Sequence, residues 1–132
     1  MTFDEIRIAT ESRLASWDGV PVAYDGVPNG PIVQAAIDAG EAWVRLTIQH
    51  GDSRTAGLGS TPEVRRPGLI QCQVFTPDNQ GSAEAYQIAD SLAAQLQYYR
   101  SGALETLAAS VQRVGPSNGW YQINVSTPFR AG

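Results

Sequence analysis

Two runs in the middle of the chain alternate between apolar and polar residues, which is the period of a β-strand. They are Glu41–His50 and Leu69–Thr76. Each run predicts a strand with one buried face and one face open to solvent. The apolar members, which we expect to face the core, are Ala42, Val44, Leu46, Ile48, Ile70, Cys72 and Val74.

Two other segments carry apolar residues at the spacing of an amphipathic helix. Thr2-Phe3-Asp4-Glu5 is a capping box, which predicts a helix that starts there and ends at Asp18-Gly19. Ser82 is a suitable cap for a second helix, which we expect to reach about Tyr99 before Gly102 stops it. The predicted core face of the first helix is Phe3, Ile6, Thr10, Leu14 and Trp17.

The remaining signals predict short strands and turns. Strands are expected over Val20–Tyr24, Leu104–Val114 and Trp120–Thr127, with Pro128 ending the last pairing. Val27–Gly40 carries structure breakers and is predicted as a loop with a short helix. The order α–β–β–β–α–β–β predicts an α+β two-layer sandwich, in which two helices cover a mostly antiparallel sheet of about four to five strands. Residues 1–132 are expected to form a single domain.

A long segment, residues 51–67, separates the two alternating strands. It is rich in Gly, Ser, Thr and Pro and carries Arg54, Arg65 and Arg66. Compact domains join strands with a few residues, so a connection of this length is functional or disordered. Folded back as a β-hairpin arm, it would reach about 25 Å, which is enough to lap over a neighbouring small domain. We therefore expect this arm to take part in the function.

Composition narrows the class of protein. The chain has 132 residues and a net charge of −4, and all nine of its basic residues are arginine. An acidic chain lacks the positive surface of a nucleic-acid binder. No apolar run is long enough to span a membrane, and the acidic N-terminus is unlike a signal peptide. We expect a soluble protein of the cytoplasmic type.

Residues that could support catalysis or metal binding do not form a complete set. Gly51-Asp52-Ser53 resembles the nucleophile block of the GDS-type esterases, but a serine nucleophile needs a histidine base. The single histidine, His50, immediately precedes that block, and those esterases take their base from late in the chain. One histidine and the single cysteine, Cys72, do not make a closed zinc site. We expect no catalytic, cofactor-binding or metal-binding residues, and a buried Cys72.

Three stretches together resemble the small tail-terminator-like proteins of long-tailed bacteriophages and prophages. They are Trp43-Val44-Arg45-Leu46-Thr47-Ile48 with His50-Gly51-Asp52-Ser53-Arg54, then Arg66-Pro67-Gly68-Leu69-Ile70-Gln71-Cys72-Gln73-Val74-Phe75-Thr76-Pro77, and finally Gly119-Trp120-Tyr121-Gln122-Ile123-Asn124-Val125-Ser126-Thr127-Pro128-Phe129. The two predicted helices fit the same family by position, so the resemblance covers nearly the whole chain.

The resemblance implies a structural protein of the virion, at the head-proximal end of the tail. Such a protein forms a ring, typically a hexamer, that caps the tail tube, stops its polymerisation and presents a surface for joining the head. The implied partners are other copies of the chain, the major tail tube protein and a head-completion protein, and DNA passes through the ring without specific binding. Assembly takes place in the host bacterial cytoplasm.

A ring needs a head-to-tail interface that closes on itself, and aromatic residues and arginine are enriched at such interfaces. The residues predicted for the subunit or tube interface are Trp43, Arg45, Arg54, Arg65 and Arg66. Two other functions stay open on the sequence alone. One is a head–tail connector or neck completion protein, and the other, from a different class, is a small esterase that uses Ser53.

Overall fold

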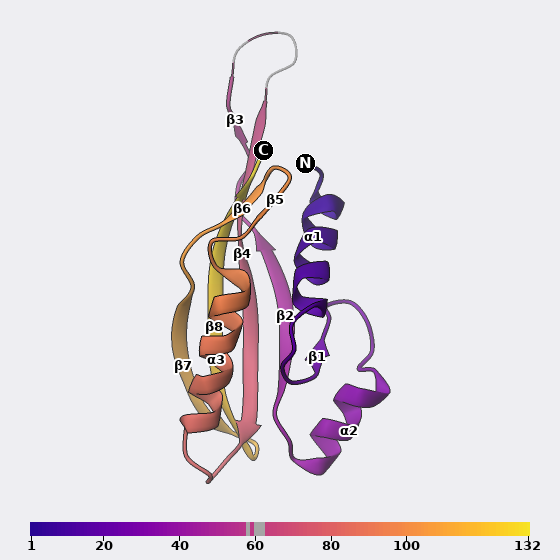
Figure 1. Ribbon diagram of the computed structural model, residues 1–132, viewed down its shortest axis with the longest axis vertical. Helices are drawn as coiled ribbons and strands as arrows, with labels where there is room; N and C mark the ends of the chain where they lie inside the picture. Colours follow the sequence, from indigo (N-terminus) through magenta and orange to yellow (C-terminus); the bar gives the residue numbers. More distant parts are fainter. Residues whose placement is uncertain (58, 60–62) are drawn as a thin grey trace.

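The computed structural model describes residues 1–57, 59 and 63–132. Over these residues the protein is an α+β fold of three helices and a curled, mixed sheet of eight strands (Figure 1). The elements are α1 (Phe3–Ala15), β1 (Val22–Ala23), α2 (Pro31–Ala39), β2 (Trp43–His50), β3 (Arg54–Thr55), β4 (Val64–Pro77), α3 (Ala83–Leu96), β5 (Arg100–Ser101), β6 (Leu104–Thr106), β7 (Ser110–Ser117) and β8 (Trp120–Ala131). The prediction of an α+β fold is confirmed. The expected two helices and four to five strands are fewer than the three helices and eight strands of the described residues.

Strands β4 and β8 form the centre of the sheet. They pair antiparallel from Arg66↔Ala131 to Pro77↔Trp120. Strand β2 lies antiparallel on the other side of β4, and β1 is parallel to β2 beside Val44 and Arg45. The far side of β8 is shared, because β7 pairs with its first part and β6 with its end. This shared edge lets two short strands cover one long strand.

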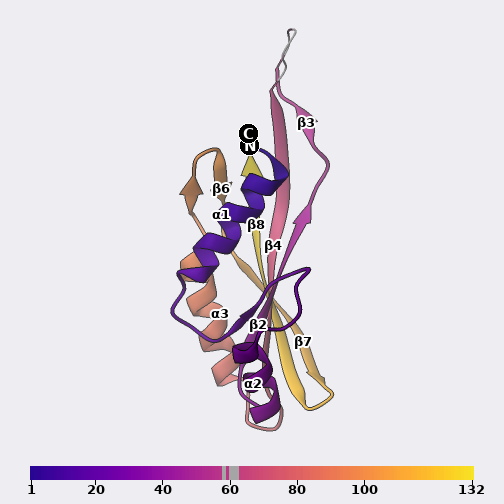
Figure 2. The ribbon, with the colours of Figure 1, turned by 90° about the vertical axis from the view of Figure 1, so that its right-hand side faces the viewer.

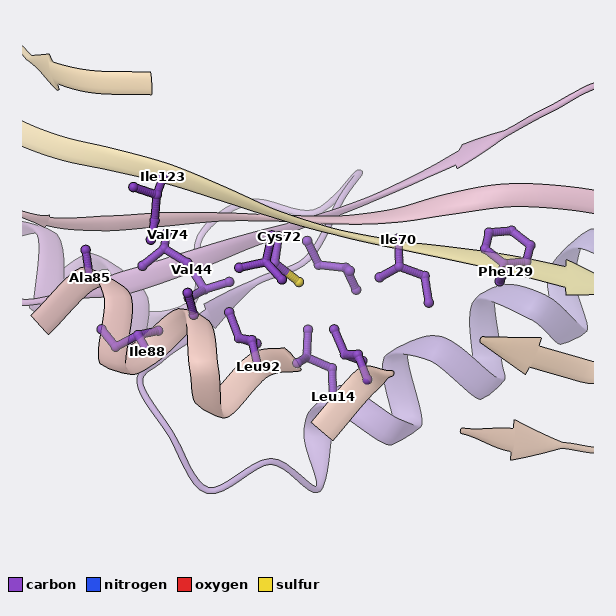
Figure 3. Close-up of a cluster of buried hydrophobic side chains, with 14 of the residues drawn as sticks. Leu14, Val44, Ile70, Cys72, Val74, Ala85, Ile88, Leu92, Ile123 and Phe129 are labelled. Carbon is purple, nitrogen blue, oxygen red and sulfur yellow. The ribbon is translucent and has the colours of Figure 1, made fainter. Parts of the chain in front are cut away.

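Helices α1 and α3 lie side by side on one face of the sheet, in both views of the molecule (Figures 1 and 2). Their apolar stripes enclose the main core together with alternate residues of β2, β4 and β8 (Figure 3). The predicted inward sets are confirmed, with Ile48 partly buried. The fully buried strand residues include Val44, Leu46, Ile70, Cys72, Val74, Ile123 and Val125.

The predicted capping box begins α1. The Thr2 hydroxyl accepts a hydrogen bond from the Glu5 amide at 3.1 Å, and the Glu5 carboxylate accepts one from the Thr2 amide at 2.9 Å. The hydrogen bond from the Thr2 amide to the Glu5 carboxylate is the main reason that the pKa of Glu5 lies below its usual value. The helix ends at Ala15, before the predicted Asp18-Gly19. Phe3 was expected in the core but is 48% exposed, because it lies in the first turn, beyond the body of α3.

Helix α2, Pro31–Ala39, confirms the prediction of a loop with a short helix over Val27–Gly40. Pro31 stands at the first helical position, where its missing N–H is not needed, and Gly40 closes the helix at φ +68°. Val33 and Ala36 pack in a second small cluster against Trp43. The two breakers therefore mark the ends of a helix instead of preventing one.

In the second half of the chain, the ends of one helix and of one strand differ from the prediction. Helix α3 ends at Leu96, earlier than the predicted Tyr99, and Tyr98 follows in the left-handed region at φ +53°. The predicted strand over Leu104–Val114 is divided into β6 and β7. A buried hydroxyl holds this bend, because Thr106 donates to the Leu96 carbonyl and accepts from the Tyr99 amide at 2.7 Å.

Strand β8 continues through Pro128, so the prediction that Pro128 ends the pairing is wrong. Pro128 pairs with Leu69 in the β4 ladder. The Pro128 carbonyl accepts a hydrogen bond from the Leu107 amide at 2.8 Å, so the proline nitrogen faces the same edge. This is the gap where the partner of β8 changes from β7 to β6, and no N–H is needed there.

Candidate assembly surface

The arm, residues 51–67, begins as a two-stranded ladder that leaves the body of the protein. Arg54 pairs with Arg65 and Thr55 with Val64, and the Ala56 amide donates to the Glu63 carbonyl at 2.7 Å. Figure 1 shows this ladder extending from one end of the molecule beyond both chain termini. Positions 58 and 60–62 lie outside the described residues. No other described strand pairs with Arg54–Thr55 or with Val64 and Arg65, so this ladder is a projecting surface.

Two arginines face each other on this ladder. Arg54 and Arg65 are directly opposed in the antiparallel register, so both side chains lie on the same face. Arg65 forms an ion pair with Glu63 at 3.4 Å, between side chains that are 51% and 70% exposed. Opposed like charges destabilise a strand pair. The arrangement therefore favours a partner whose carboxylates or carbonyls can accept from two guanidinium groups.

Arg66 has a different role from its neighbour. Its Nη1 donates to the Met1 carbonyl at 2.7 Å, and its guanidinium lies 4.7 Å from the centre of the Phe3 ring. These contacts fix the start of α1 against β4. Arg66 was predicted as an interface residue, and its observed contacts with Met1 and Phe3 lie within one copy of the chain.

Trp43 lies on the face of the sheet opposite to the main core. It is 6% exposed, stacks on Phe75 at 4.4 Å and meets Trp120 edge-on at 6.3 Å. Arg45 lies over the Trp43 ring at 5.4 Å and stays exposed. The burial of Trp43 is explained within the single chain, so its contact with another copy stays a prediction.

Beyond this aromatic cluster, the centre of the sheet face that α1 and α3 do not cover carries uncharged polar side chains, while Arg65, Glu105 and Arg130 lie on the same face toward the arm. Amides bond each other across it, from Gln49 to Gln71 and from Gln122 to Asn124, each at 3.0 Å. Arg45 is the charged residue that β2 contributes to this face. We call this face of the sheet the amide face. Its central members are Thr47, Gln49, Gln71, Gln73, Gln122 and Asn124.

A groove of about 450 Å³ runs between α1 and the outer edge of β2. One wall carries the carboxylates of Asp4, Glu11 and Asp25, and the other is formed by β2 from Leu46 to His50. Sequence patterns did not predict this edge groove. The local sequence feature that accompanies the groove is Gly26, whose φ of +80° turns the chain away from β2 shortly after β1.

The residues considered for catalysis are not assembled into a site. His50 packs edge-on against Phe3 at 5.0 Å and Phe129 at 6.1 Å, and no hydrogen bond joins it to Ser53 within the described residues. Cys72 is buried as predicted, and burial raises the pKa of its thiol to about 12. Over residues 1–57, 59 and 63–132, no group of three possible ligands could hold a metal ion.

In the part of the chain that the structure describes, no helix is both long and apolar enough to cross a membrane.

The fold and the arm define a small α+β protein with an arginine-bearing projection. Residues 5–129 match the phage tail terminator protein family, and the chain belongs to this family. No curated protein matches the chain. One solved structure has the same fold, with a TM-score of 0.73 and 22% identity, over 100% of this chain and 96% of the other. The family is that of the resemblance found in the sequence, and it makes the chain a phage tail structural protein.

Proposed function

We propose that this protein forms a closed ring, most simply a hexamer, that caps the completed tail tube. The ring stops further addition of tube subunits and presents the surface to which the head is joined. This places it at the head-proximal end of the tail. Membership of the phage tail terminator family supports the general role, and the arm is the observation that carries the specific proposal.

The arm supports an assembly role because burial within one copy of the chain gives its ladder little stability. A two-stranded ladder alone is marginal in water, and this one buries no side chain at Arg54, Thr55 or Val64. It also carries two opposed guanidinium groups. Contact with a neighbouring subunit, or with the tube, would provide both apolar burial and anionic partners.

The amide face suits the surface that DNA passes in such a ring. Phosphate binding depends on arginine and lysine, and the central members of this face are uncharged. Amide and hydroxyl groups remain hydrated beside a moving polyanion and provide no ion pairs to retain it. In this proposal the amide face turns toward the lumen and the helices turn away from it.

The test is assembly with purified partners. Light scattering after size-exclusion chromatography and negative-stain microscopy should show closed rings of the chain. Added to polymerising tail tube protein, the chain should shorten the tubes and appear as a cap at one end. A protein that is monomeric at every concentration, and neither binds nor caps tubes, would contradict the proposal.

A pull-down separates the tail terminator from the neck protein that the sequence left open. The tube cap should retain tail tube protein more strongly than portal-side protein. The reverse order would indicate a neck completion protein. Hydrolysis of a simple ester that is lost in Ser53→Ala would instead indicate the esterase.

A further inference from the structure

Strand β2 has an outer edge that is left without a partner along most of its length. Strand β1 pairs with β2 only at Val44 and Arg45. The chain then turns away at Gly26, and no described residue pairs with the outer edge of Leu46–His50. This unpaired edge is one wall of the edge groove.

The direction of the free backbone groups follows from two observed hydrogen bonds. The Val44 amide donates outward to the Pro21 carbonyl at 2.9 Å, and the Gly51 amide donates inward to the Pro67 carbonyl at 2.9 Å. Successive residues of a strand alternate in this respect. The amides of Leu46 and Ile48 therefore point into the edge groove.

This edge also lacks the features that keep an exposed strand from pairing. Sheet edges are protected by proline, by a bulge or by charged side chains. Leu46-Thr47-Ile48-Gln49-His50 has no proline and no acidic, lysine or arginine residue. The other long free edge, β7, has a register shift between Arg113 and Gly115 and a proline at Pro116. Of these two edges, β2 is the one suited to accept a strand.

The charge of the groove indicates what the added strand carries. Three carboxylates, of Asp4, Glu11 and Asp25, line it with one guanidinium, of Arg7. Arg7 pairs with Asp4 and with Glu11, each at 2.8 Å, and these partners raise its pKa. Asp25 forms no ion pair with any described residue. The groove is therefore short of positive charge beside a free strand edge.

We infer that the edge groove is the acceptor for the arm of a second copy, whose β3 adds to β2 as an extra strand. Among the described residues, strand β3 pairs with β4 alone, so its outer edge has no partner there. It brings Arg54, and the opposed Arg65, toward the carboxylates of the groove. The edge from Leu46 to His50 is about 13 Å long, which the extended residues 51–57 can cover.

The donor and the acceptor lie on different parts of the chain, so the contact is head-to-tail. An interface of this kind repeats from copy to copy and closes into a ring when its rotation allows. The inference rests on the proposed ring and names the contact that closes it. It also places carboxylates of a second copy beside Arg54 and Arg65, of which Arg65 already pairs with the exposed Glu63.

Charge reversal tests the contact. We expect Asp25→Arg and Arg54→Glu each to raise the concentration needed for half-assembly about tenfold, which is about 1.4 kcal/mol. The chain carrying both reversals should return to within about threefold of the original chain, since the pair is again complementary. Both side chains are exposed, so thermal unfolding should confirm an intact fold in every variant.

Arg113→Glu is the matched control, because Arg113 is an exposed arginine on the competing edge, β7. It should assemble like the original chain. Amide exchange provides a second readout that needs no variant. The amides of Leu46 and Ile48 should become protected in rings, while those of Thr47 and Gln49, already bonded to β4, should change little.

Rings that form and cap tubes normally in both single reversals would overturn the acceptor and leave the proposed function standing. Loss of assembly in Arg113→Glu alone would also overturn the acceptor, because it would assign β7 as the contact. Unchanged amide exchange at Leu46 and Ile48 on ring formation would overturn it as well. A chain that never forms rings and never caps tubes would overturn the proposed function together with the acceptor.

Discussion

The two ends of strand β4 lie in different environments. From Ile70 to Val74 the strand is paired on both sides, by β2 and β8, and every second side chain is buried under the helices. At Val64 and Arg65 it pairs on one side only, with β3, and neither side chain is buried. One continuous strand thus supplies the core at one end and a projecting surface at the other.

This difference separates stability from assembly along a single element. Changes at the body end should affect the free energy of unfolding of one chain. Changes at the arm end should leave that free energy nearly constant and affect contact with other chains. The predictions that follow test this separation, from the largest expected effect to the smallest.

The largest loss of stability is expected for Trp43→Ala, in the aromatic cluster beside the body end of β4. Removing the ring exposes Phe75 and the apolar side of α2, and should cost about 3–5 kcal/mol in urea unfolding of the monomer. Trp43→Phe keeps the stacking and should cost less. A cost below about 1 kcal/mol for Trp43→Ala would mean that Trp43 serves another copy of the chain.

A matched pair on β4 compares its two ends directly. Ile70→Ala should destabilise the protein by about 2–5 kcal/mol, because Ile70 is 1% exposed in the main core. Val64→Ala, on the arm, should change stability by less than about 0.5 kcal/mol. Urea midpoints measured at one protein concentration give both values. Equal costs at the two positions would contradict the separation.

The buried thiol of Cys72 makes the body end sensitive to high pH. Burial raises the pKa of Cys72 from 9.0 to about 12, so its contribution to stability is complete below pH 9 and is lost as the pH rises toward 12. The stability difference between the chain and its Cys72→Val variant should shift by about 1.4 kcal/mol for each pH unit above 9. A difference that is constant from pH 8 to pH 10.5 would argue against a buried thiol.

The smallest effect on stability is expected for the arginines of the arm. Arg54→Ala and Arg65→Ala should each change the free energy of unfolding by less than about 0.5 kcal/mol. Arg54→Ala removes the charge opposed to Arg65, so its sign should be slightly stabilising at low salt. A thermal melt at two ionic strengths checks this. A loss of more than about 1 kcal/mol in the free energy of unfolding would mean that the arm contributes to the stability of the single chain.

Periodic and capped segments of the fold could be predicted from the sequence. The alternation of Glu41–His50 and Leu69–Thr76 identified their buried faces, and Thr2 and Glu5 form the predicted cap. Boundaries set by distant neighbours could not be predicted in this way. Strand β4 begins at Val64, without alternation, because β3 pairs with it at Val64 and Arg65 and β8 pairs with it from Arg66 onward.

The same limit applies to the candidate site. The arm and its arginines stand out in composition, so Arg54 and Arg65 could be predicted as interface residues from the sequence, and their contact with another chain stays a prediction. The contact of Arg66 with Met1 joins residues far apart in the chain, and no local pattern predicts it. The edge groove depends on where β1 leaves β2, which only the sheet register shows.

The central claim is that the arm is needed for contact between copies of the chain and not for the folding of a single copy. Replacing residues 55–64 by Asn-Gly closes Arg54 and Arg65 with a two-residue hairpin turn and removes most of the arm. Light scattering and tube capping should then be measured on a variant whose circular dichroism and urea midpoint match those of the original chain. We predict a folded monomer that neither forms rings nor caps tubes. A folded variant that still forms rings and caps tubes would contradict the claim.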